Sequence, residues 1–79
     1  MTYRIPIQFN ARPYRGVIRK REIRGIDAEG ESPLDAAQKA RDIAASRIGT
    51  RIANALCQVF TVNSVEVRMD LFQEPRPSR

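Results

Sequence analysis

The stretch EGESPLDAAQKARDIAASRIG, residues 29–49, decides the fold, because it predicts both the start and the apolar face of one amphipathic helix. Ser32 is a good N-cap, Pro33 suits the first helical position, and Asp35 follows three residues after the cap, as a capping box requires. A stripe made mostly of alanine lets a helix approach a sheet closely. The residues at helical spacing that form this stripe are Ala36, Ala37, Ala40, Ile43, Ala44 and Ile48.

The segment before the helix predicts extended structure. TYRIPIQFN, residues 2–10, alternates apolar and polar side chains, which is typical of a half-buried strand. Pro6 cannot donate a ladder hydrogen bond, so we expect this strand at a sheet edge or with that amide position toward solvent. NARP, residues 10–13, predicts a turn. Residues 14–28 then form either one long strand or a hairpin that folds at RKRE.

The segment after the helix is ambiguous at first and clear later. Gly49 is either the C-cap or a tolerated flaw in a longer helix. Residues 50–60, TRIANALCQVF, keep a helical stripe but end in β-prone residues. We predict a second helix there, and a strand from Cys57 to Val62 remains the alternative. VEVRMDLF, residues 65–72, alternates and predicts a strand. The inward residues of that strand are expected to be Val65, Val67, Met69 and Leu71.

These elements predict an α+β fold. The order is strand, strand, helix, a second helix or third strand, and a final strand, which fits a two-layer domain with a helix on one face of a mainly antiparallel sheet. We expect residues 1–72 to form this single domain and residues 73–79, with two prolines and no apolar side chain, to form a disordered tail. No apolar run approaches the ~20 residues that cross a bilayer, and we expect a soluble, cytoplasmic protein.

The residue types argue against catalysis and cofactor binding. The chain has no histidine, so the commonest general base and metal ligand is missing. The single cysteine, Cys57, lies in an apolar stretch and is expected to be a buried core residue. The acids before the helix are explained by the positive end of the helix dipole. We therefore expect no enzyme activity, no cofactor and no metal site.

Positive charge is concentrated in the N-terminal third. The chain carries 14 basic and 9 acidic residues, and residues 1–26 hold seven of the bases but only one acid, Glu22. Neither face of RKREIRG, residues 19–25, is purely apolar, so we expect this segment to project as a strand end or hairpin tip. It could bind phosphates or acidic side chains, or its charges could only keep an edge strand from aggregating. The expected binding residues are Arg12, Arg15, Arg19, Lys20, Arg21 and Arg24.

Residues 23–44, IRGIDAEGESPLDAAQKARDIA, run from a strand through a turn into an alanine-rich capped helix. This layout resembles a unit of many small phage and mobile-element proteins, including several anti-CRISPR proteins. The resemblance implies a non-enzymatic inhibitor that docks on the protein subunits or the nucleic-acid channel of a CRISPR effector. Many anti-CRISPR proteins are acidic DNA mimics, whereas this chain is basic, which excludes simple mimicry.

A second resemblance is to the arm-type DNA-binding domain of phage integrases, in which a three-stranded sheet backed by a helix reads DNA. There the helix follows three strands, whereas here a further strand follows the helix. Two functions are therefore expected from the same basic surface. The first is an inhibitor of a nucleoprotein complex such as a CRISPR effector, and the alternative is a domain that binds DNA or RNA phosphates directly.

Overall fold

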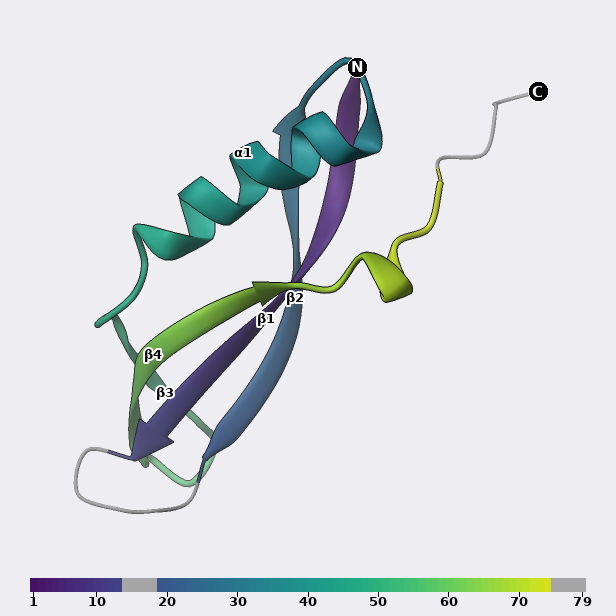
Figure 1. Ribbon diagram of the computed structural model, residues 1–79. Coiled ribbons are helices and arrows are strands. Elements are labelled where there is room, and N and C mark those ends of the chain that lie inside the picture. Colours follow the sequence, from purple (N-terminus) through teal and green to yellow (C-terminus); the bar gives the residue numbers. More distant parts are fainter. Residues whose placement is uncertain (14–18, 75–79) are drawn as a thin grey trace.

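The computed structural model describes residues 1–13 and 19–74 of the chain (Figure 1). The alternating N-terminal segment forms the longest strand, β1, Thr2–Pro13. Every second side chain of β1, from Tyr3 to Ala11, is buried on the face that carries the helix. The predicted turn at residues 10–13 is wrong, because Asn10–Pro13 continues β1 and pairs with another strand.

The sheet has four antiparallel strands in the order β2-β1-β4-β3. β1 is therefore a central strand, and the expectation that Pro6 marks an edge strand is wrong. Pro6 is tolerated because the pairing of β1 with β4, Val59–Val67, begins only at Ile7. The Pro6 carbonyl accepts a hydrogen bond of 2.9 Å from the Arg68 amide. The donor that proline lacks is not needed there, because the Arg68 carbonyl accepts a hydrogen bond of 2.9 Å from the Leu71 amide.

β2, Lys20–Glu29, is one continuous strand that pairs with β1 along its whole length. The alternative hairpin at RKRE is wrong, since Lys20, Arg21 and Glu22 continue β2 and pair with β1. Residues 14–18, which include the first part of the predicted second segment, lie outside the described residues. The C-terminal end of β2 contributes Ile26 and Ala28 to the core beneath the helix.

The predicted helix is confirmed as α1, Pro33–Ala45. The Ser32 hydroxyl accepts a hydrogen bond of 3.2 Å from the Asp35 amide, and the Asp35 carboxylate accepts one of 3.0 Å from the Glu31 amide. Asp35 also pairs with Lys39, 3.6 Å away, one turn later. Alanines alone form the buried stripe: Ala36, Ala37, Ala40 and Ala44.

The helical stripe ends earlier than predicted. Ile43 lies within α1 but beside the buried alanines and is 40% exposed, whereas Ile48 is 48% exposed because the helix ends at Ala45 and the chain turns back toward the sheet. Gly49 is not the C-cap, which is Ser46. Gly49 instead has a positive φ of 87° in the turn that follows. Its amide donates a hydrogen bond of 2.7 Å to Val62 of β4.

Residues 51–53 and 59–62 lie in strands, so the predicted second helix is wrong, and the alternative strand from Cys57 to Val62 is present only from Val59 onward. β3, Arg51–Ala53, pairs with the start of β4. A tight turn joins them, in which the Asn54 carbonyl accepts from the Cys57 amide at 3.0 Å and the Asn54 side chain accepts from the Leu56 and Gln58 amides. Cys57 is exposed and has a φ of 58°, so the expectation of a buried core cysteine is also wrong.

β4 carries a bulge that sequence periodicity does not reveal. Ala11 lies opposite Val62 and Asn10 lies opposite Ser64, so Asn63 is an extra residue. The bulge lets Val62 and Val65, three residues apart, both face the core. The chain then forms a short 3-10 helix, η1, Met69–Leu71, in place of the predicted strand end. Met69 packs against the core, whereas Leu71 is exposed.

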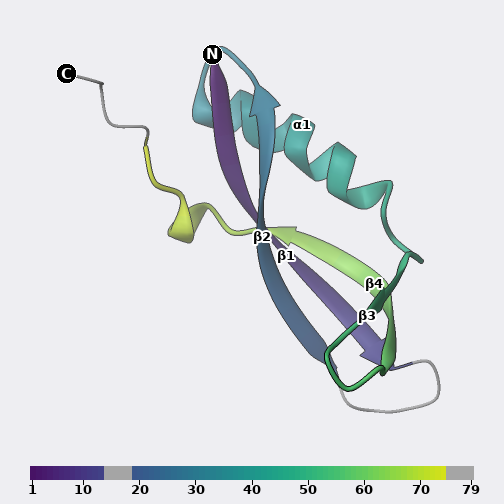
Figure 2. The same ribbon diagram turned by 180° about the vertical axis from the view of Figure 1, so that it is seen from behind.

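The predicted α+β class is confirmed: α1 covers one face of a curled four-stranded sheet (Figures 1 and 2). Figure 1 shows that β1, β2, β3 and β4 extend beyond the helix at one end of the sheet. Within the described part of the chain, no helix is long and apolar enough to cross a membrane. Of the predicted tail, residues 75–79 lie outside the described residues.

Candidate binding surface

The sheet face opposite α1, which we name the outer face, carries polar and charged side chains. Its β1 residues follow from alternation, since the odd-numbered residues of β1 point into the core. α1 packs on the other face of the sheet (Figures 1 and 2). The outer-face residues of β1 are Arg4, Pro6, Gln8, Asn10 and Arg12.

A chain of polar side chains crosses from β1 to β4 on the outer face. The Gln8 amide nitrogen donates to Asn10 at 2.8 Å and to Glu66 at 3.4 Å. Asn10 in turn donates to the Ser64 hydroxyl at 3.0 Å. Gln8 is the one buried polar side chain among the described residues, and all of its hydrogen-bonding groups have partners. These contacts fix the register of β1 against β4 on the polar side.

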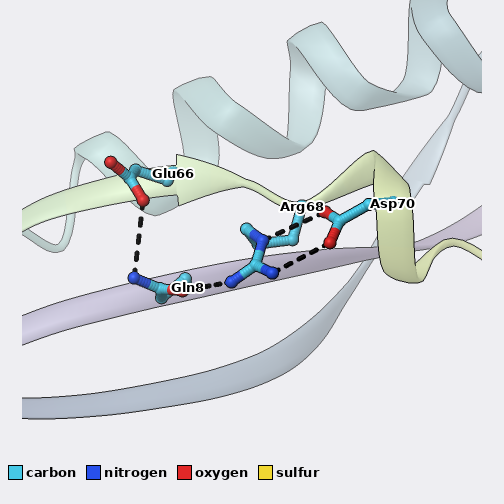
Figure 3. Close-up of polar contacts among 4 residues, drawn as sticks. All are labelled: Gln8, Glu66, Arg68 and Asp70. Carbon is cyan, nitrogen blue, oxygen red and sulfur yellow. Dashed lines mark hydrogen bonds and ion pairs between the residues drawn. The ribbon is translucent and has the colours of Figure 1, made fainter.

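Arg68 ends this polar chain beside η1 (Figure 3). Its Nη1 donates to the Gln8 side-chain oxygen, and its Nε and Nη2 donate to the two Asp70 carboxylate oxygens at 3.0 and 2.8 Å. The hydrogen bonds between Arg68 and Asp70 lower the pKa of the Asp70 carboxyl and raise the pKa of Arg68. The guanidinium is thus oriented by hydrogen bonds from all three of its nitrogens.

The outer face is hollowed between β2 and β4. The hollow is open to solvent and has a volume of about 420 Å³. Two arginines line it from the N-terminal end of β2 and one from the end of β4, while Glu66 is its one acid. Its lining residues are Gln8, Asn10, Arg19, Arg21, Ser64, Glu66 and Arg68.

The structure divides the predicted binding residues between the two faces of the sheet. Arg12, Arg19 and Arg21 lie on the outer face. We name the part of the outer face that these three residues form its basic end. None of these three makes an ion pair with a residue in 1–13 or 19–74. Each can therefore bind an anion without breaking a salt bridge that the structure describes.

The other predicted residues lie elsewhere. Lys20 and Arg24 point to the helix side, where the Lys20 ammonium lies 5.3 Å from the centroid of the Phe60 ring. Arg24 pairs with Glu22 at 3.0 Å. Arg15 lies outside the described residues. Residues 19–25 form a strand end, one of the two expected forms, and from Lys20 onward they pair with β1.

Sequence reasoning missed Gln8, Asn10, Ser64 and Arg68. Each was recognisable as the polar side of a strand, but their proximity depends on β4 pairing with β1. Neither the distance of over fifty residues between these strands nor the bulge at Asn63 follows from periodicity. A set of amide and arginine side chains on the polar sides of two strands was the one feature in the sequence that could have indicated the hollow.

A second, smaller hollow lies on the helix side, where the sheet extends past α1. Its volume is about 170 Å³, and its floor includes the buried Phe9 and Val62. Arg24 and Arg47 contribute to its lining. Within residues 1–13 and 19–74, no group of three acidic, cysteine or histidine residues is placed to hold a metal ion.

Comparison with known protein families, curated proteins and solved structures finds no match for this chain. The resemblances to anti-CRISPR proteins and to the integrase arm-type domain therefore remain predictions. What the structure contributes is the placement of the charged and polar side chains on one uncovered sheet face.

Proposed function

We propose that this chain is a non-enzymatic protein that binds the phosphate groups of a nucleic acid through the basic end of its outer face. The observation that carries the proposal is that Arg12, Arg19 and Arg21 share this uncovered face and make no ion pair with a described residue. A guanidinium presents a planar fork that bonds two phosphate oxygens at once. Such contacts position a protein on a nucleic acid whatever its sequence.

The polar side chains of the hollow support a nucleic acid over a simple anion. Asn10 and Ser64 offer amide and hydroxyl groups next to Arg19 and Arg21. Amide and arginine side chains are the groups that read base edges in a groove, and a β-ribbon is narrow enough to enter the major groove. Asn10 and Ser64 bond to each other but remain accessible, whereas Gln8 is buried, so we assign Gln8 to holding the hollow in shape.

The acids of the same face favour a second candidate. Asp27, Glu66 and Asp70 also lie on the outer face or at its end, where they would repel a phosphate backbone. A mixed surface of this kind suits a partner that offers both phosphates and basic side chains. The second candidate is therefore an inhibitor, of phage or mobile-element origin, that docks on a nucleoprotein complex such as a CRISPR effector in the cytoplasm.

The test is a fluorescence anisotropy titration of the protein against short labelled duplex DNA, single-stranded DNA and RNA. Direct binding that weakens steeply with added salt is expected if the basic end binds phosphates. A pull-down from cell extract, with and without nuclease, separates the two candidates. Retention of protein partners after nuclease treatment, without binding to the free probes, would favour the inhibitor. Absence of binding in both assays would contradict both candidates.

A further inference from the structure

β2 is a long edge strand with one free side. In the sheet order β2-β1-β4-β3, β2 pairs with β1 alone among residues 1–13 and 19–74. Edge strands offer unpaired backbone groups to a further strand unless charges or bulges prevent it. In the middle of this edge, Ile23 lies 47% exposed. The surface therefore combines unpaired backbone with an exposed apolar side chain.

The Pro6 contact shows which backbone groups point to the free side. Since the Pro6 carbonyl bonds to Arg68 on the β4 side, Pro6 points its backbone groups away from β2. Gly25 lies directly opposite Pro6, and opposite residues of an antiparallel pair either both face each other or both face away. Gly25 thus directs its amide and carbonyl to the free edge, and Ile23, two residues earlier, does the same.

The charges around Ile23 match a second copy of the same strand. Glu22 and Arg24 flank Ile23, and both point to the helix side of the sheet, where they pair with each other at 3.0 Å. In an antiparallel pair centred on Ile23, residue 22 of one copy lies opposite residue 24 of the other. Each glutamate would then face one arginine of the other copy, which gives two such pairs, one on each side of the two-fold axis.

We propose that the free edge of β2 binds the β2 edge of a second copy, antiparallel and centred on Ile23. Ile23 would contact Ile23 of the other copy at the axis, where the two isoleucines exchange both backbone hydrogen bonds. Opposite residues of a ladder share a face, so both α1 helices lie on one side and both outer faces on the other. Arg21 would lie opposite Gly25, and Arg19 would lie opposite Asp27 of the second copy, whose carboxylate already pairs with Arg4 at 3.1 Å.

Charge alone does not argue against this pairing. Charged edge strands commonly prevent association, because like charges meet when copies approach. Around Ile23 the opposite holds, since a glutamate meets an arginine on each side of the axis. The pairing is a property of the edge itself and is independent of nucleic acid, so its test uses protein alone.

The test is sedimentation of three variants, Glu22→Arg, Arg24→Glu and the double swap, measured alone and in mixtures. Each single variant places like charges opposite each other in the proposed dimer. The dissociation constant of its dimer is expected to be at least about tenfold higher than that of the wild type. An equimolar mixture of the two single variants restores opposite charges at both contacts. The contacts within each chain stay like-charged in that mixture, so recovery of the dimer can come only from contacts between chains.

The double swap restores both kinds of contact and should dimerise like the wild type. Circular dichroism confirms that each variant is folded before sedimentation. A wild-type protein that stays monomeric over the concentration range would overturn the proposal. So would single variants that dimerise as well as the wild type, or a mixture of folded single variants that stays monomeric.

Discussion

Arg68 donates hydrogen bonds to both carboxylate oxygens of Asp70, with its Nε 3.0 Å from one oxygen and its Nη2 2.8 Å from the other. The remaining Nη1 donates to Gln8 in the central strand (Figure 3). This pair therefore does more than occupy the surface. It orients an arginine of the outer-face hollow and joins the end of β4 to β1.

The first prediction concerns acid stability. The hydrogen bonds from Arg68 lower the pKa of Asp70 in the folded protein. The stabilisation by this pair is therefore present at neutral pH, above the unfolded pKa, and is lost as the pH falls through the folded pKa. Asp70→Asn should be less stable than the wild type at neutral pH, and the difference should shrink in acid. Asp42→Asn, at an exposed helix position without an ion pair to a described residue, is the control for urea titrations at both pH values.

A second prediction concerns Cys57. A side chain at its φ of 58° is strained, whereas glycine adopts this conformation without a Cβ penalty. Cys57→Gly should raise the free energy of unfolding by about 0.5 to 1 kcal/mol, after allowing for the greater freedom of glycine in the unfolded chain. Cys57→Ala keeps the Cβ and should give no such gain. If chemical denaturation finds both variants equally stable, the turn conformation is not as described.

The third prediction tests the helix face. Ala40 is fully buried against the sheet, so Ala40→Glu should cost about 3 kcal/mol or more by burying an unpaired charge. Gln38→Glu introduces the same carboxylate on the exposed face of the same helix and should change the stability by less than about 0.5 kcal/mol. Thermal melting of the two variants side by side gives the difference. Similar melting temperatures would mean that α1 packs through another face.

The fourth prediction compares two glycines. A Cβ on Gly30 would lie 2.6 Å from the backbone nitrogen of Ala36, which cannot move without shifting the start of α1. A Cβ on Gly25 would lie equally close to Arg4, but there the neighbour is a flexible, exposed side chain. Gly30→Ala should therefore lower the free energy of unfolding by about 1 to 3 kcal/mol, whereas Gly25→Ala should change it by less than about 0.5 kcal/mol. Equal losses of stability in urea titrations would contradict this close approach at Gly30.

The strongest local patterns predicted the fold. Alternation from Tyr3 to Phe9 and the capped alanine stripe needed no tertiary information, because each element fixes its own buried face. The failure at the end of β1 has one physical cause, which is pairing with a distant strand. Residues 10–13 look like a turn, yet β4 extends β1 through Pro13.

The region after the helix was predicted wrongly for a local reason. Ile52, Leu56 and Val59 fit helical spacing, but Leu56 lies 77% exposed in the turn between β3 and β4. The Asn54 side chain satisfies the amides of that turn, a local competition with helix formation that apolar spacing does not register. Prediction of the binding residues was limited because it depends on how the strands pair. Charge clustering located Arg19 and Arg21, while their division from Lys20 and Arg24 depends on the pairing of β2.

That division permits the most direct test of the proposed binding surface. Two double variants, Arg19→Ala with Arg21→Ala and Lys20→Ala with Arg24→Ala, remove the same charge from neighbouring positions of one strand end. Both are titrated against labelled duplex DNA at several salt concentrations, after thermal melting confirms that each is folded. The outer-face variant should bind more weakly and lower the slope of log affinity against log salt by about two units, and the helix-side variant should bind nearly as the wild type. Equal weakening by both variants would mean that only net charge matters, and would contradict a binding site on the outer face.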